Sequence, residues 1–239
     1  MKVYRAWCVG SCVVAIMLAT ATGAVASEST EKAGEDGTEA AARATTEASG
    51  KLLDDIARAR TKITSLEAAF DQTRRIGLLA TDVTSRGKVL LVRPDRLRWE
   101  LLPPEAMTYW VGPEGLSFAS PTTSASVDKR TAGALGEVME DLLVFLAGDI
   151  KTLHQRYDLR ATSLGGEEDN VLVQAKPKGV KAKQVVQRVE FTLGKDRVRP
   201  VEVKVYETDT DFVRIRFRDV KTNVSVDAAK MRPAGKEIK

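Results

Sequence analysis

Residues 87–102 read GKVLLVRPDRLRWELL, and this stretch decides the fold of the chain. Its apolar residues recur with a period of two, which predicts two β-strands. The alternation is interrupted at Arg93-Pro94-Asp95, where the proline lacks the N–H that ladder pairing needs. Because apolar residues fall on both faces, the stretch predicts a sheet that wraps around something, and it leaves open which face points inward. The apolar residues of the two faces are Val89, Leu90, Leu91, Val92, Leu97, Trp99 and Leu101.

The same alternation continues through the C-terminal half of the chain. Apolar residues alternate with charged ones in several runs, and short turns rich in Gly, Lys or Asp separate the runs. Sequential alternating strands joined by tight turns predict one antiparallel sheet with one face towards solvent. The expected strands cover residues 68–76, 107–111, 116–119, 157–164, 170–175, 185–193, 199–206 and 212–220.

Two stretches, residues 51–66 and 131–147, have the spacing of amphipathic helices. A third, short helix is expected after Asp149, whose side chain can accept a hydrogen bond from a free N–H of the first turn. These two or three helices must cover the dry face of the sheet. The apolar stripe of residues 131–147 fits an ordinary core, or a ligand lid if the sheet beneath it is hollow.

The N-terminus has the pattern of a secretory signal peptide. Lys2 and Arg5 precede an uncharged apolar run, and Ala24-Val25-Ala26 fits a cleavage site. The run is shorter than the roughly 20 residues of a membrane span. We therefore expect cleavage after Ala26, with an uncleaved anchor as the alternative.

Three segments follow from this pattern: a signal peptide (1–26), a flexible acidic tether (27–50) and a single domain (51–239). The tether is rich in Glu, Ala, Thr, Ser and Gly, a composition that buries too little apolar surface to fold. Both cysteines, Cys8 and Cys12, belong to the signal peptide. The exported protein would then be soluble, without disulfides and without a lipidated cysteine.

Composition and charge exclude several classes of function. The formal net charge is +4, and a basic surface suits nucleic acid, anionic lipid or an acidic partner. Export makes nucleic acid the least expected of these, and we predict no nucleic-acid partner. The single histidine, His154, has no evident nucleophile or metal-ligand companion. We therefore expect no enzyme, no catalytic residue, no metal and no cofactor.

A series of motifs runs in a fixed order along residues 51–225. After the first helix they are Phe70-x-Gln72, Gly87, Arg93-Pro94-x-x-x-Arg98-Trp99, Pro103 or Pro104, Gly115, the leucine-rich helix, and Leu172-Val173 before Pro177. In this order the chain resembles the periplasmic outer-membrane lipoprotein carrier family, the LolA-like proteins.

The resemblance implies an α+β fold, in which a strongly curved antiparallel sheet forms an unclosed β-barrel. Two or three helices act as a lid over a hydrophobic cavity. It also implies a periplasmic carrier that receives acylated lipoproteins from an inner-membrane ABC transporter and delivers them to an outer-membrane acceptor. We expect a monomer.

The resemblance further implies a gating role for Arg93, by hydrogen bonds to the lid, and a place in the cavity wall for Leu97. The alternative for Arg93 is a strand-end arginine paired locally, with Asp95 or with a backbone carbonyl. Together with the apolar faces above, the candidate cavity residues are Leu52, Ile56, Phe70, Val89, Leu91, Leu97, Trp99, Leu135, Val138, Leu142 and Leu146.

Some features depart from the family. The tether is long, aromatic residues are few, and residues 231–239 lack the Phe-containing ending of close carriers. The run 74–79 is more similar to divergent members encoded with lipid or pigment biosynthesis. Two alternatives therefore stay open: a carrier of another amphiphile, such as a glycolipid or aryl polyene, and a periplasmic interaction domain with a solid core.

Overall fold

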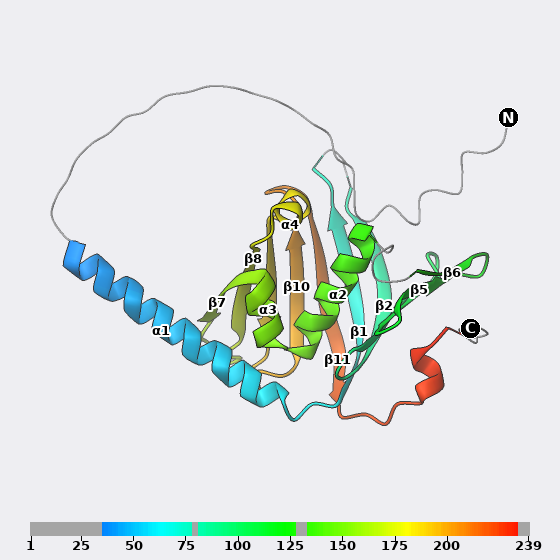
Figure 1. The fold of residues 1–239 in the computed structure, drawn as a ribbon, viewed down its shortest axis with the longest axis horizontal. Coiled ribbons are helices and arrows are strands. Elements are labelled where there is room, and N and C mark those ends of the chain that lie inside the picture. Colours follow the sequence, from blue (N-terminus) through cyan, green and yellow to red (C-terminus); the bar gives the residue numbers. More distant parts are fainter. Residues whose placement is uncertain (1–34, 78–80, 128–132, 234–239) are drawn as a thin grey trace, which may run out of the picture.

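The computed structural model describes residues 35–77, 81–127 and 133–233. Within these ranges, eleven strands form one antiparallel sheet in the order β6-β5-β4-β3-β2-β1-β11-β10-β9-β8-β7 (Figure 1). The edge strands β6 and β7 do not pair with each other, so the sheet is an unclosed barrel, and the predicted α+β fold is confirmed. The strands are β1 (Ser65–Arg75), β2 (Val83–Val92), β3 (Arg96–Leu101), β4 (Met107–Gly112), β5 (Gly115–Ala119), β6 (Ser124–Val127), β7 (Tyr157–Ser163), β8 (Val171–Pro177), β9 (Arg188–Leu193), β10 (Pro200–Tyr206) and β11 (Phe212–Thr222).

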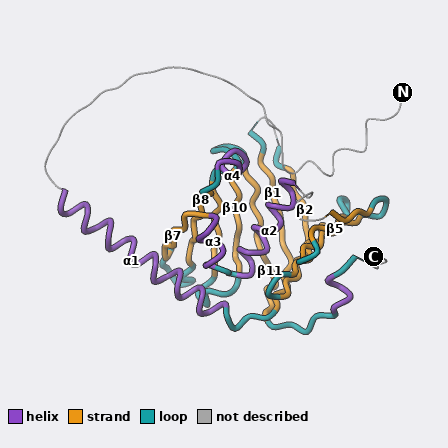
Figure 2. The backbone as a smooth tube through the Cα atoms, in the orientation of Figure 1, coloured by secondary structure: helices purple, strands orange, loops and turns teal. Residues whose placement is uncertain are grey.

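Helices cover one face and one edge of this sheet (Figure 2). Two of them, α2 (Gly133–Ala147) and α3 (Ile150–Arg156), lie across the face, and α1 (Glu35–Arg60) packs along the edge strand β7. The short α4 (Val180–Val185) connects β8 to β9, and a 3-10 turn, η1 (Ala228–Met231), contacts β3. The face under α2 and α3 is called the inner face below.

The stretch quoted first forms β2 and β3, as predicted. Val89 pairs with Trp99 and Leu91 with Leu97, and all four side chains are at most 4% exposed. Leu90, on the other face, is only half-buried. The structure thus answers the question that the sequence left open, because the Val89 face is the inner one.

The inner face is tightly packed beneath β1, β2 and β3. The Phe70 ring stacks on the Trp99 ring with 4.0 Å between centroids and 25° between planes. Phe70 pairs with Gly87 across the β1–β2 ladder, and a Cβ on Gly87 would lie 2.1 Å from Phe70 Cζ and 2.3 Å from the Glu100 carbonyl oxygen. Only glycine therefore leaves room for the ring.

The first helix differs from the prediction at both ends. It begins at Glu35, so residues 35–50 are helical where a flexible tether was expected, and it ends at Arg60 instead of continuing to residue 66. Alanines supply high helix propensity in this segment, and the helix docks onto β7 from Ser49, whose hydroxyl accepts a hydrogen bond from the Ala161 N–H (2.8 Å). The C-terminal part changes to a strand because Leu66 is needed on the inner face of β1.

The C-terminal strands follow the predicted pattern with two exceptions. The strand expected at 185–193 begins only at Arg188, and residues 180–185 before it form α4, which was not predicted because a helix this short shows no readable periodicity. The register of β10 shifts between Pro200 and Glu202, and this bulge turns Val201 outwards (37% exposed) while Val203 stays buried.

The expected signal peptide, residues 1–26, lies outside the described residues. Of the helices that are described, none combines the length and the apolar character that crossing a bilayer demands.

Candidate functional site

A cavity of about 160 Å³ lies between α2 and the inner face of the sheet. Most of its wall is apolar and comes from α2, from the end of α4, and from β3, β4, β9, β10 and β11. The residues that line it are Gln72, Trp99, Leu101, Tyr109, Met139, Asp141, Leu142, Phe145, Tyr157, Val185, Val186, Val189, Val203, Val205, Glu207, Val213 and Ile215. The arrangement can hold an apolar group beneath a helical lid.

The end of this lid is held by a buried arginine at the last position of α1. Arg60 donates one hydrogen bond to the Leu146 carbonyl, near the C-terminus of α2, and another to the Val198 carbonyl (2.6 Å) in the β9–β10 turn. Its guanidinium carbon lies 5.5 Å from the centroid of the Phe191 ring. Arg60 thus ties α1, the lid helix and the sheet together.

The pKa of Arg60 reflects how deeply its side chain is buried. Burial, and then the nearby charge of Arg93, lower the pKa of the Arg60 guanidinium to about 9, while Asp196 acts in the opposite sense. The group therefore remains a cation at neutral pH. Gly148 makes space for it, since a Cβ there would lie 2.0 Å from Arg60 Cδ and the backbone has a φ of +66°.

Arg93 lies next to Arg60, whose hydrogen bonds to the Leu146 and Val198 carbonyls are called the clamp below. The Arg93 guanidinium donates to the backbone carbonyl of Arg60, and among the described residues it makes no hydrogen bond to α2. Burial acts to raise the pKa of Asp149, but hydrogen bonds from Thr152 outweigh it and lower the pKa. The charge of Arg93 also helps to lower it. As predicted, Asp149 caps α3 by accepting from the Thr152 N–H (3.0 Å). Arg93 therefore reaches the lid through Arg60, and its gating role stays a prediction.

A second polar connection holds the middle of the lid. Asp141 of α2 accepts a hydrogen bond from the Tyr157 hydroxyl and lies 2.7 Å from Arg156 Nη1. These partners belong to the end of α3 and the start of β7. Within the described part of the chain, polar contacts thus attach the lid helix to its neighbours at its end and in its middle.

The predicted cavity residues divide into three groups. Trp99 and Leu142 line the cavity. Six others are fully buried in the core beside it, and Leu52 packs against that core; the six are Ile56, Phe70, Val89, Leu91, Leu97 and Leu146. Leu135 and Val138 belong to α2, but their side chains lie outside the described part of the chain. Whether any of them contacts a ligand stays a prediction.

The sequence did not single out the wall formed by β9, β10 and β11. Val189, Val203, Val205, Val213 and Ile215 contribute most of it. Their alternation was visible and predicted the strands, but periodicity alone cannot separate a cavity wall from a filled core.

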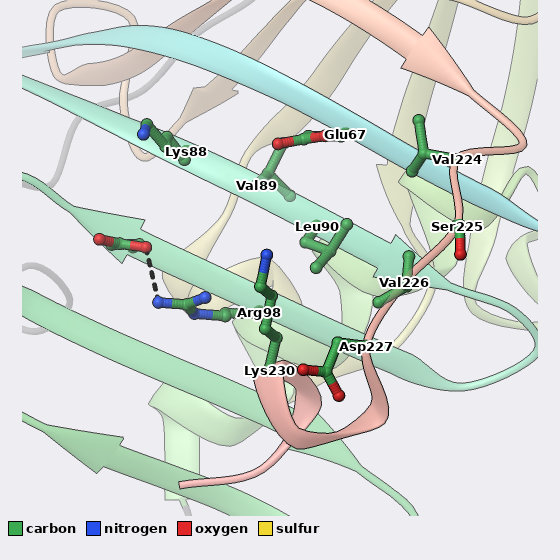
Figure 3. A pocket seen from close by; sticks show the side chains of 11 residues that line it. Glu67, Lys88, Val89, Leu90, Arg98, Val224, Ser225, Val226, Asp227 and Lys230 are labelled. Atoms are coloured by element: carbon green, nitrogen blue, oxygen red, sulfur yellow. Dashed lines mark hydrogen bonds and ion pairs between the residues drawn. The ribbon is translucent and has the colours of Figure 1, made fainter. Parts of the chain in front are cut away.

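A second hollow lies on the outer face, where the C-terminal segment crosses β1, β2 and β3 (Figure 3). Figure 3 shows Lys230 directed towards this hollow beside Arg98, which pairs with Glu100 at 2.8 Å. Trp110 Nε1 donates to the Lys230 carbonyl (3.0 Å), which fixes the crossing segment. The charged side chains that line this outer hollow have both signs. Such a lining suits contact with the polar C-terminal segment better than binding of an apolar ligand. These side chains are Glu67, Lys88, Arg98, Glu100, Asp227 and Lys230. Across the described ranges, no cluster of three or more His, Cys, Asp or Glu residues could hold a metal ion.

Comparisons with known proteins agree with the fold. The family model described as "Outer membrane lipoprotein carrier protein LolA" matches residues 61–233. No curated protein sequence matches the chain significantly.

Among solved structures, an uncharacterized conserved protein from Thermus thermophilus is similar, with a TM-score of 0.50 and 11% identity over 80% of this chain and 96% of that one. A DUF1329 family protein from Desulfovibrio piger has a TM-score of 0.47 and 13% identity over 77% and 97% of the two chains. A LolA superfamily protein from Nitrosomonas europaea has a TM-score of 0.41 and 11% identity over 77% and 97%. At such identities the likeness concerns the fold alone.

Proposed function

The chain belongs to the family of outer membrane lipoprotein carrier proteins, the LolA family, and we propose that it binds the acyl chains of lipoproteins under α2 and carries them through the periplasm. Proteins of this family are periplasmic carriers rather than enzymes. The observation that carries the proposal is the apolar cavity beneath α2, a helix that the described polar contacts of Arg60 and Asp141 hold in place. This cavity also disfavours the alternative of an interaction domain with a solid core.

The energetics suit a carrier that must both hold and release. Burying an acyl chain contributes roughly 0.8 kcal/mol per methylene. Each polar contact of the lid contributes on the order of 1 kcal/mol. Burial of a few methylenes therefore offsets the loss of the bonds made by Arg60 and Asp141.

The size of the cavity indicates a closed state. Its volume of about 160 Å³ is similar to that of a cavity known to hold a benzene molecule, ~150 Å³. A long acyl chain needs more room, so α2 moves outwards when cargo enters. Arg93 takes part in this opening through Arg60, whose carbonyl it binds.

The complete pathway is part of the proposal. The signal peptide is removed after Ala26, the soluble monomer receives cargo from an inner-membrane ABC transporter, and an outer-membrane acceptor takes the cargo over. Mass spectrometry of molecules that copurify with the protein tests the cargo. Exclusive recovery of a glycolipid or another non-peptidic amphiphile would favour the alternative carrier.

Binding of a fluorescent acyl probe to the purified protein tests the cavity directly. Leu142→Glu places a charge in the apolar wall and should weaken binding by about tenfold or more, since an unpaired charge is costly there. Leu164→Glu is the matched control, because Leu164 is 55% exposed on the β7–β8 connection. Equal probe affinity in both variants, or no binding to the wild-type protein, would refute the proposal.

A further inference from the structure

The inner face of the sheet changes from apolar to polar at one end of the cavity. Along β1, the inward residues Leu66, Ala68 and Phe70 are at most 2% exposed. Gln72 and Arg74 follow on the same face, because strand residues two apart point to the same side. The space under α2 therefore has an apolar end and a polar end.

An ion pair marks the polar end. Glu207 directly follows β10 and continues the inward positions Val203 and Val205. Arg74 Nη2 lies 3.1 Å from Glu207 Oε1, and the two side chains are only 14% and 27% exposed. Burial raises the pKa of Glu207, Arg74 lowers it, and the nearby Asp211 raises it again. The pair is neutral in sum, so it attracts uncharged polar groups and gives an anion no net attraction.

Gln72 adds an amide that has no partner of its own. It lines the cavity, and no hydrogen bond to its side chain exists within the described part of the chain. An amide offers two N–H donors and one acceptor oxygen. A purely hydrocarbon ligand would bury these groups unsatisfied, whereas a carbonyl oxygen would accept from them.

We propose that Gln72, Arg74 and Glu207 form a subsite for the uncharged carbonyl linkages, ester or amide, that join acyl chains to the head of the cargo. The inference rests on the proposed function, since the acyl chains themselves occupy the apolar end near Trp99 and Phe145. It assigns the ligand a direction in the cavity, with its tail under α2 and its linkage beside the β10–β11 turn.

Three amphiphiles with the same chain length test the subsite by displacement of a fluorescent acyl probe. Glyceryl monolaurate carries an ester carbonyl, dodecyl glycerol ether lacks it, and laurate carries a negative charge. The ester should displace the probe at roughly fivefold lower concentration than the ether, because one neutral hydrogen bond separates them. Gln72→Leu should abolish this difference, whereas Gln174→Leu, on the opposite face of β8, should keep it.

A second variant reverses the selectivity. Glu207→Gln removes the carboxylate that repels an anion at this end of the cavity, so laurate should bind roughly tenfold more tightly than to the wild-type protein. Unfolding cannot produce such a gain. Equal displacement by ester and ether in the wild-type protein, or unchanged laurate affinity in Glu207→Gln, would overturn the subsite while probe binding still supports a carrier. Failure of the probe itself to bind would refute the carrier and the subsite together.

Discussion

The interior of the protein consists of two parts that are packed differently. Beneath β1, β2 and β3, the Phe70 ring fits over Gly87 and stacks on Trp99, with no room for one additional methyl group. Beneath α2, the positions of β9, β10 and β11 that line the cavity of about 160 Å³ are mainly valines. The same alternating pattern builds both parts, but the Phe70–Trp99 stack fills the first, whereas β9, β10 and β11 turn mainly valines towards the cavity of the second.

The close-packed part stabilises the fold, and the part with the cavity allows the opening that we propose. A close-packed core resists any change of volume, and the aromatic stack therefore fixes the curvature of the sheet. The empty space beneath α2 leaves room for the lid movement that we propose. A carrier requires both properties in one domain.

A small substitution in the close-packed part beneath β1, β2 and β3 should cause the largest loss in the free energy of unfolding. Gly87→Ala forces the Phe70 ring and the Glu100 carbonyl apart, because the new Cβ would lie within 2.3 Å of both. We expect a loss of about 3 kcal/mol in the free energy of unfolding, measured by urea denaturation. Gly50→Ala is the control: its Cβ meets nothing within 4 Å in the middle of α1, so it should gain about 1 kcal/mol. A neutral Gly87→Ala would mean that the stack does not limit the packing.

Loss of Arg60, which connects α1, α2 and the sheet, should have the second-largest effect on the free energy of unfolding. Arg60→Met keeps an unbranched side chain but removes the donors to the Leu146 and Val198 carbonyls. We expect a loss of about 2 kcal/mol in unfolding free energy and faster uptake of an acyl probe, since the end of α2 is released.

Stopped-flow fluorescence measures this uptake, and Arg58→Met serves as the control. Arg58 is 71% exposed, and Asp55 is its ion-pair partner among the described residues, so its replacement should change neither quantity. If Arg60→Met took up the probe at the wild-type rate, the clamp would have no part in opening the lid.

Much of the fold could be predicted from the sequence, because a period of two places apolar residues on one face whatever their neighbours are. The break at Arg93-Pro94 and the cap at Asp149 are equally local, and the structure confirms both. The early start of α1 was missed because its alanine-rich first turns carry no apolar stripe, and Ser49 is the first of its described side chains to be buried.

The site was harder to predict, because it depends on distances between remote segments. Arg60 contacts carbonyls 86 and 138 residues away, and no pattern within α1 indicates this. Arg93 was identified by resemblance, but its bond to the Arg60 carbonyl could not be foreseen. The hollow under α2 arises from the combined volumes of side chains on separate strands, which a one-dimensional pattern does not contain.

The hollow part should tolerate a change that the packed part would not. Val205→Phe adds a ring on the cavity wall, where space exists, and should change the unfolding free energy by less than about 1 kcal/mol. It should nevertheless lower acyl-probe affinity by about tenfold, since the ring displaces roughly two methylenes of the ligand. Val201→Phe on the same strand points outwards (37% exposed) and should leave binding unchanged. Destabilisation of Val205→Phe as large as that of Gly87→Ala would show that the two parts are packed alike, and the contrast between them would then fail.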